Sequence, residues 1–212
     1  PFGTRIVEKR TSVLKNYDLG HSWTATSDSE YSKSTNVLAS QEAGMLFAEV
    51  CVKQAKPRGR IGIILPNGYL GNRSQKYHVF RHWLLKNCKL AGIVSFPRFT
   101  FKSSGADVTT SVLFLEKREK PLDRIADEEY RFFVEVVENL GWEAGNKTAA
   151  PIYRRSPEDG SYIINEAGDF IVDADFEGIL KRIRSGAATD DFSWLAEGHE
   201  PGNRGVCPFP KY

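Results

Sequence analysis

Two loops of this chain carry residues whose types and spacing suit ligand binding. The first is Pro66-Asn67-Gly68, which ends the short apolar run 61–65. The second, residues 97–109, is polar, contains glycine and begins with aromatic residues, and it leads into the apolar run 110–115. In an open α/β sheet, ligands bind at the loops that follow the carboxyl ends of parallel strands. The chemistry of the protein is therefore expected at these two loops.

The histidines are weaker candidates. His21 lies close to Asp18, but a lone histidine near an aspartate is better read as a loop residue than as a catalytic pair. His78 and His82 are four residues apart on one helical face, which is a spacing compatible with a metal ion. No third ligand of a suitable type lies nearby in the sequence, so surface or packing roles are favoured. No metal is predicted.

Apolar periodicity places the two loops in an α/β unit. The predicted elements are a helix over 40–56, a strand over 61–65, a helix over 74–87, and strands over 89–97 and 108–116. Residues 59–97 then form a β-α-β unit, which should be parallel and right-handed. The loop before the last strand is too short for a parallel crossover, so that strand should run antiparallel.

The same periodicity predicts which helical residues are buried. Ser40 is the candidate N-cap of the first helix. The buried stripe of that helix is predicted to contain Met45, Leu46, Phe47, Val50 and Cys51. In the second helix, Arg81 is expected to face outward with Lys76 and Lys86. Cys51 and Cys88 are both interpreted as small core residues.

The two ends of the chain give weaker signals. Residues 1–40 are polar and lack periodic apolar positions, which predicts an irregular loop segment. Beyond residue 120, a strand is predicted over 131–137 and a short amphipathic helix over 176–183. We therefore expect a main body over 1–120 and an accessory α+β tail over 121–212, which leads toward a possible downstream domain.

Composition is ordinary for a globular protein, with 41% hydrophobic and 26% charged residues among 212. The net charge of +2 is too small to indicate a partner, but its distribution is uneven. No Asp or Glu occurs from Lys53 to Lys102, and acids predominate from Glu116 to Glu143. The cationic half suits a polyanion, and a solvated basic face is the alternative. Three scattered cysteines and the lack of a membrane-length apolar run favour a cytoplasmic protein without a membrane partner.

Several segments, taken in order, resemble the catalytic region of the N6-adenine DNA methyltransferases, above all the modification subunit of type I restriction systems. The similar segments are 41–55, Arg58-Gly-Arg-Ile-Gly-Ile-Ile-Leu-Pro-Asn-Gly68, Phe80-Arg-His-Trp-Leu-Leu85 and 96–115. The resemblance covers about residues 41–117 and continues more weakly at Glu138-Asn-Leu-Gly-Trp142. It implies the carboxyl-terminal part of a Rossmann-like S-adenosylmethionine-dependent methyltransferase sheet, in which parallel strands end in an antiparallel hairpin.

The resemblance also implies roles for individual residues. The family signature is Asn-Pro-Pro followed by Phe or Tyr, and this chain begins Pro1-Phe2-Gly3, so we expect a truncation inside that motif. An exocyclic amine can be methylated only after its base leaves the duplex. The resemblance implies that Pro1 and Phe2 are catalytic residues and that Phe2 stacks on the extruded base. Phe101 is the implied second aromatic contact, although Phe99 or Phe101 could instead belong to the core.

Other residues near the two loops have less specific readings. Asn67 is a turn former first, and a place beside the base is its alternative role. Arg73, Arg98 and Lys102 are candidate contacts to DNA phosphates, with a solvated surface role as the alternative. The cofactor-binding residues are expected upstream of residue 1.

Three functions remain open. The first is adenine-N6 methylation of double-stranded DNA in a restriction-modification system, with S-adenosyl-L-methionine as cofactor. Its partners would be a specificity subunit or downstream target-recognition domain and a restriction subunit. The second is methylation of an RNA base or a protein glutamine, and the third is a non-catalytic assembly module on the same sheet.

Residues 1–212 alone are expected neither to transfer a methyl group nor to bind S-adenosylmethionine, because the resemblance places most cofactor contacts upstream. Isothermal titration calorimetry of these residues with the cofactor should show no binding heat. Saturable binding would contradict this expectation.

Overall fold

The structure is a computed structural model that describes residues 6–27, 30–127, 130, 132–144 and 149–182. The first elements in chain order are β1 (Val7–Glu8), α1 (Thr11–Leu14), β2 (His21–Ala25), β3 (Tyr31–Val37), β4 (Gln41–Glu42), α2 (Ala43–Gln54) and β5 (Arg60–Pro66). They are followed by α3 (Asn67–Gly71), α4 (Gln75–Asn87), β6 (Cys88–Phe96), η1 (Lys102–Ser104), β7 (Thr110–Lys117), η2 (Ile125–Asp127), β8 (Phe133–Val136) and α5 (Phe176–Arg182).

The main sheet has the strand order β5-β7-β6-β8. β7 runs antiparallel to both of its neighbours, which confirms the predicted antiparallel last strand. β5 and β6 consequently point the same way, as the predicted β-α-β unit requires, but β7 lies between them. β8 then pairs with β6 in parallel. The result is a mixed α/β sheet.

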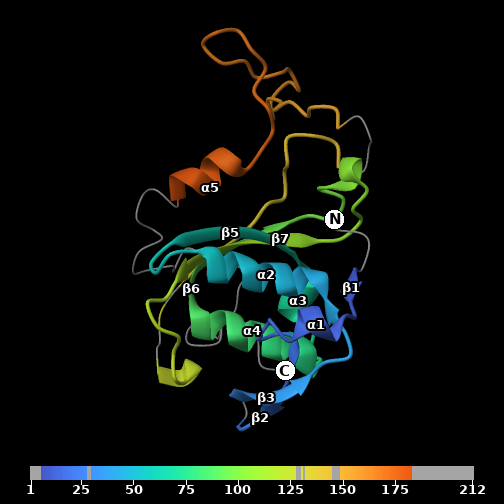
Figure 1. The fold of residues 1–212 in the computed structure, drawn as a ribbon. Coiled ribbons are helices and arrows are strands. Elements are labelled where there is room, and N and C mark those ends of the chain that lie inside the picture. Colours follow the sequence, from blue (N-terminus) through green and yellow to red (C-terminus); the bar gives the residue numbers. More distant parts are fainter. Residues whose placement is uncertain (1–5, 28–29, 128–129, 131, 145–148, 183–212) are drawn as a thin grey trace.

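Helices α2 and α4 cover one face of this sheet, as Figure 1 shows. Leu113 of β7 and Phe80 and Leu84 of α4 are almost completely buried in the resulting core. α5 lies on the opposite face, where Ile179 packs with Val94 of β6 and Phe133 of β8. The helices confirm the predicted positions to within a few residues, while the segment 67–71, expected to be a turn, is the short helix α3.

The buried face of α2 differs from the predicted stripe. Met45 and Leu46 are buried as expected, but Phe47 is 67% exposed and Cys51 is exposed. The buried positions also include Glu49, whose side chain is fully inside. A charged residue in the core shifts the buried face of the helix, and apolar periodicity cannot reveal such a shift. Cys88, by contrast, is buried as predicted.

Glu49 is buried because it binds the chain that precedes β2. The backbone N–H groups of Asp18 and Leu19 donate to its two carboxylate oxygens at 2.7 and 2.8 Å. Lys53, one helical turn later, forms an ion pair with the same carboxylate at 2.5 Å. A buried carboxylate is tolerated only when it is paired and hydrogen-bonded, and both conditions hold here. Glu49 therefore attaches the amino-terminal segment to the helix layer.

The first 40 residues are not irregular as expected. From residue 6 onward they contain a helical turn, α1, and an antiparallel pair of strands, β2 and β3, which lies beyond α4 from the main sheet. Most residues of β2 and β3 are only partly buried or exposed, so the alternation of apolar residues that marks a strand in the sequence is absent. Residues 41–42 form β4 rather than a helical start, and Glu42, not Ser40, occupies the N-cap of α2.

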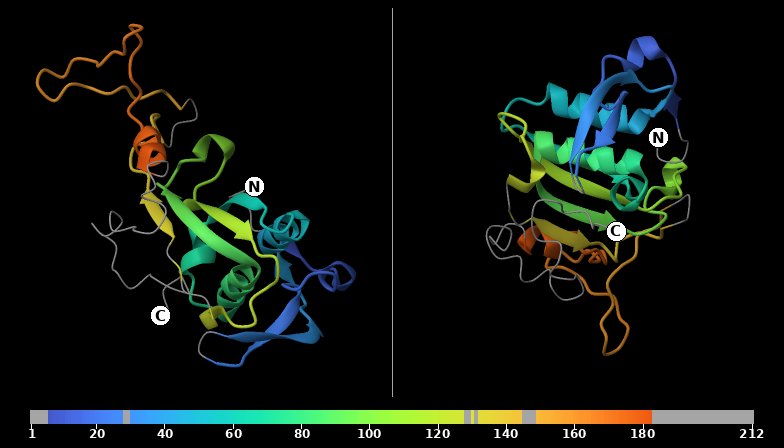
Figure 2. Two further views of the ribbon diagram at one scale, coloured as in Figure 1. Left: turned by 90° about the vertical axis from the view of Figure 1, so that its left-hand side faces the viewer. Right: turned by 90° about the horizontal axis from the view of Figure 1, so that it is seen from below.

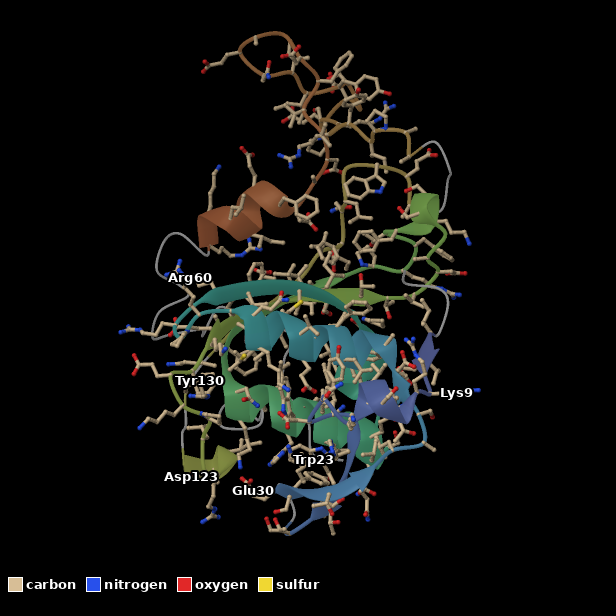
Figure 3. All side chains as sticks on the ribbon, viewed as in Figure 1. Lys9, Trp23, Glu30, Arg60, Asp123 and Tyr130 are labelled. Atoms are coloured by element: carbon tan, nitrogen blue, oxygen red, sulfur yellow. The ribbon has the colours of Figure 1, made fainter. Side chains whose placement is uncertain are left out.

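A partly buried glutamate, Glu30, and a buried histidine, His82, connect the start of β3 to α4. The Oε2 atom of Glu30 lies 3.0 Å from Nε2 of His82, and its Oε1 accepts a 2.6 Å hydrogen bond from the Ile125 backbone N–H. Figure 3 shows Glu30 and Trp23 beside β2 and β3, at the bottom of the view. Burial lowers the pKa of His82 below its usual value. The histidine packs in this cluster, in agreement with the packing role predicted for it.

Arg81 was expected to face outward, and that prediction was wrong. Its side chain is 4% exposed, and its guanidinium donates to the backbone carbonyls of Tyr69 and Asn72 at 3.0 Å each. These carbonyls lie at the end of α3, where a helix leaves acceptors without intrahelical partners. Arg81 thus fixes the segment that follows the carboxyl end of β5.

Replacing Glu49 by Ala should lower the free energy of unfolding by about 2–5 kcal/mol, because two backbone N–H groups lose their acceptors. Urea unfolding followed by tryptophan fluorescence measures the change. Glu158→Ala, at an exposed position, is the control and should stay within about 0.5 kcal/mol of the unmodified protein. An equally small effect at Glu49 would show that the carboxylate does not anchor this segment.

Candidate functional site

The carboxyl ends of β5 and β6 meet on either side of the first residue of β7. Thr110 is aligned with Pro66 in one pair of strands and with Phe96 in the other. Each of the two loops singled out in the sequence therefore leaves the sheet next to Thr110. The Thr110 side chain is fully buried, and its hydroxyl has no hydrogen-bond partner among the described residues. The structure thus brings the two loops together.

A short chain of hydrogen bonds crosses the sheet at this point. The Ser111 hydroxyl donates to Oδ1 of Asn67 at 2.7 Å, and it lies 2.9 Å from the Ser95 hydroxyl. Because the Ser111 hydroxyl proton is donated to the Asn67 amide oxygen, the Ser95 hydroxyl must be the donor to the Ser111 oxygen. This arrangement fixes the orientation of the Asn67 amide and leaves its NH₂ group to donate to a ligand.

The loop between β6 and β7 is held in one conformation by its own backbone. The N–H groups of Ser104 and Ala106 both donate to the carbonyl of Phe101, at 3.0 and 3.1 Å. Gly105 has a φ of +83°, a left-handed conformation that suits glycine. Thr100 and Ala106, both in the loop, are buried. The loop is compact, and it can therefore hold an aromatic side chain in a defined place.

Phe101 lies at the start of η1 within this loop and is half-buried. Its ring meets the Phe96 ring edge to face, with 6.3 Å between centroids. Phe96 in turn packs against the second core cluster of the molecule, in which Phe176 also takes part. The Phe101 ring thus contacts the end of β6, and the residue lies in the loop that follows this strand.

Arg98 and Lys102, the predicted phosphate contacts, lie around the remaining phenylalanine of the loop. The Arg98 guanidinium is 4.8 Å and the Lys102 ammonium 5.3 Å from the centroid of the Phe99 ring. Both cations also pair with Asp107, at 3.0 and 3.6 Å. Asp107 therefore offsets part of the positive charge that the sequence suggested for this rim.

Several other cations of the run from Lys53 to Lys102 also form contacts within the protein. Lys53 pairs with Glu49 and Asp18, and Lys76 pairs with Glu42. Arg81 is buried, as described above. These contacts offset part of the positive charge of the run.

The remaining predicted site residues are placed as follows. Arg73 is exposed in the segment between α3 and α4, away in sequence from the loop that carries Arg98 and Lys102. Pro1 and Phe2 lie outside the described residues. The end of the predicted accessory tail, from residue 183 onward, lies outside them as well. β1 lies near the end of the sheet at which β5 finishes. Arg60, the first residue of β5, lies at the other end (Figures 1 and 3).

Within the described part of the chain, no group of three metal-ligating side chains occurs, so His78 and His82 have no third ligand there. No helix in that part is both long and apolar enough to span a bilayer. The site is therefore a neutral amide, three aromatic residues and a small ion cluster at the carboxyl edge of a sheet. Such a site can bind a planar ring by stacking and hydrogen bonding.

Sequence reasoning missed the two serines. Ser95 and Ser111 each interrupt an apolar strand near its end beside the loops, and that interruption is the signal that could have revealed them. A serine is not unusual in a strand. Only the pairing of β6 with β7, which aligns Ser95 with Ser111, identifies the two as neighbours.

Comparison with known proteins adds a family. A family model described as N-6 DNA Methylase matches residues 6–149, about two thirds of the chain. Among curated proteins, none matches.

Solved structures give weaker likenesses. One is described as a modification subunit of a type I restriction enzyme from Vibrio vulnificus YJ016, with 19% identity, 81% of this chain and 35% of that chain covered, and a TM-score of 0.42. Another is the EcoKI M protein of a type I restriction enzyme, with 18% identity, 57% and 25% coverage, and a TM-score of 0.38. A third is described as a class I S-adenosylmethionine-dependent methyltransferase from Listeria monocytogenes, with 22% identity, 53% and 31% coverage, and a TM-score of 0.37. The chain thus spans about a third or less of these proteins, and likenesses of this size do not bear on function.

Proposed function

Because this chain belongs to the N-6 DNA methylase family, we propose that it is part of a site-specific DNA methyltransferase of a restriction-modification system. The full-length protein transfers a methyl group from S-adenosylmethionine to the N6 atom of adenine. The observation that carries the proposal is the family match over residues 6–149, together with a site at the sheet edge that suits a planar base. Its partners are double-stranded DNA, a specificity subunit or target-recognition domain, and a restriction subunit.

The described residues suit the base rather than the cofactor. At the ends of β5 and β6 they offer an oriented amide, Asn67, and an aromatic ring, Phe101. S-adenosylmethionine supplies the methyl group when bound. The work of these residues is to hold an extruded base against its aromatic partner and to keep its orientation fixed.

Two residues have distinct tasks in this proposal. Phe101 stacks on the extruded base, because its ring is supported on one side by Phe96. The Asn67 NH₂ group donates to an acceptor nitrogen on the ring edge, because Ser111 already occupies the amide oxygen. Pro1 and Phe2, which lie outside the described residues, are the other proposed contacts to the base. No residue with a shifted pKa is required, since positioning of the amine accounts for the catalytic effect.

Arg73, Arg98 and Lys102 contact phosphates of the DNA backbone in this proposal. Such contacts position the duplex without reading its sequence. Asp107 keeps Arg98 and Lys102 together beside Phe99 while the DNA is away.

Replacing Phe101 by Ala in the full-length protein should lower kcat/KM for duplex DNA by about 5- to 150-fold, since stacking on a base is worth about 1–3 kcal/mol. A radiolabelled-methyl assay on plasmid DNA measures the rate, and Phe101→Trp should retain most of it. Phe47→Ala, which removes an exposed phenylalanine of α2 outside the site, is the control and should leave the rate unchanged. An unaltered rate for Phe101→Ala would remove this residue from the site.

Ser111→Ala should lower kcat about fivefold with little change in KM, because the variant loses one hydrogen bond that orients the Asn67 amide. Asn67→Ala should give an effect at least as large, and the two changes combined should not add. Ser104→Ala, in the exposed part of the loop, serves as control. If Ser111→Ala and Asn67→Ala were independent in the double variant, the hydrogen-bond chain would not orient a catalytic amide.

The other methyl acceptors are tested in the same assay. Methylation of single-stranded RNA or of a glutamine-containing peptide, with none of duplex DNA, would replace the DNA proposal. Transfer to none of the three by the full-length protein would favour the assembly module.

A further inference from the structure

Residues 149–175, called the arm below, extend away from the main sheet as a narrow projection (Figures 1 and 2). The arm leaves the body next to Leu140 and Trp142, which are paired with Ala174 and Pro151 at its base. Beyond that base, isolated antiparallel bridges connect three short runs, residues 153–155, 162–164 and 170–172. The proposed methyltransferase site makes no use of this part of the molecule.

The three runs are joined in a closed cycle. The Arg154 N–H donates to the Ile171 carbonyl at 2.8 Å, the Ile171 N–H to Ile163 at 3.0 Å, and the Ile163 N–H to Arg154 at 3.0 Å. The bridges repeat the cycle, because the last residue of each run is aligned with the first residue of the next. They join Arg155 to Tyr162, Ile164 to Phe170, and Val172 to Tyr153. The arm therefore has a pseudo-threefold arrangement and one defined backbone shape.

This arrangement places the six bridged side chains on one side of the arm. Residues aligned across antiparallel strands point to the same face, and so do residues two apart along a strand. The rings of Tyr153, Tyr162 and Phe170 accordingly meet at its centre, with centroid separations of 5.1–6.1 Å. We call this surface the aromatic face: Tyr153, Arg155, Tyr162, Ile164, Phe170 and Val172.

The aromatic face remains open to solvent. Ile164 is 55% exposed, Phe170 is 52% exposed and Tyr162 is 44% exposed. No residue from 149 to 175 is buried, so the arm has no core of its own. Contiguous exposed apolar residues of this kind mark interaction sites, and tyrosine and arginine dominate the centres of protein interfaces. The arm has a defined backbone shape although few of its side chains are shielded from water. A second molecule that covers the aromatic face would supply the missing burial.

Charge identifies the kind of molecule. The arm carries two arginines and six carboxylates, which are Glu158, Asp159, Glu166, Asp169, Asp173 and Asp175. Arg155 lies over the Tyr162 ring at 4.1 Å, and Arg154 pairs with Asp173 at 3.6 Å, so neither arginine offsets the carboxylates in the turns. DNA, which is a dense polyanion, is repelled by such a surface. A protein with an apolar centre and lysine or arginine around it is complementary to it.

We propose that the aromatic face of the arm is the docking surface for a basic companion protein of the assembly, rather than for nucleic acid. The companion is the DNA-reading subunit, because a subunit that reads DNA must carry the lysine and arginine side chains that neutralise phosphates. This identification of the partner rests on the proposed function, whereas the docking surface itself rests on the arm.

The test measures the affinity of the full-length protein for its specificity subunit by biolayer interferometry at low and high salt. Ile164→Ser, which removes an exposed apolar side chain, should weaken binding at least tenfold. Glu158→Lys/Glu166→Lys should also weaken it at least tenfold and reduce its dependence on salt, because both carboxylates are exposed and their side chains hold no described part of the arm together. Leu180→Ser, on α5 at 47% exposure, is the matched control and should bind within twofold of the unmodified protein.

Four results would overturn the inference: no binding by the unmodified protein, equal binding by all variants, a loss of duplex DNA affinity in the isolated full-length protein, or a loss of self-association by light scattering. The third would make the arm a nucleic-acid surface, and the fourth would make its occupant a second copy of the chain. Methylation assays separate this inference from the proposed function. If the arm variants weaken subunit binding but the protein transfers no methyl group, the docking surface is supported and the proposed function is contradicted. If the protein transfers methyl groups but the arm variants bind normally, the proposed function is supported and the docking surface is contradicted.

Discussion

The position of β7 between β5 and β6 is the constraint on which the rest of the structure depends. The loop of residues 97–109 is too short to return to the far end of the sheet, so β7 must run back antiparallel to β6. All of β5, from Arg60 to Pro66, is aligned with it as well. One strand thus aligns the carboxyl ends of two others and brings Asn67 to Ser111. Neither the amide nor the aromatic loop would be placed without it.

The helix layer is secured by buried polar groups, and these were the part of the fold that the sequence could not reveal. The strands β5, β6 and β7 were predictable from their continuous apolar runs, and the helix α4 from the helical spacing of its apolar residues. Glu49 and Arg81 break those periods, since each is buried through hydrogen bonds to backbone groups of a distant segment. Because Glu49 faces the core, the buried face of α2 is shifted, and Phe47 and Cys51 are exposed. A pattern read along one helix cannot detect partners supplied by another part of the chain.

The candidate site was predictable in location but not in composition. The carboxyl ends of β5 and β6 were identified from Pro66-Asn67-Gly68 and from the aromatic loop, and Phe101 lies where the loop was expected. Ser95 and Ser111 could be recognised only after the register of β6 and β7 was known. The partners of the cations were also not predictable, because Asp107, Glu42 and Glu49, which pair with residues of the run, lie outside it in the sequence. Charge along a sequence is therefore a poor guide to charge on a surface.

The two surfaces of the molecule differ in how they obtain their order. At the sheet edge, order comes from the core, since Phe101 is supported by Phe96 and Asn67 by the two serines. In the arm, it comes from a cycle of backbone hydrogen bonds and a cluster of three half-exposed rings, with no core beneath them. A surface ordered by the core can act on a ligand that binds briefly and leaves, because it keeps its shape when empty. An aromatic surface without a core gains most from a partner that remains bound, because the bound partner supplies the burial that the arm lacks.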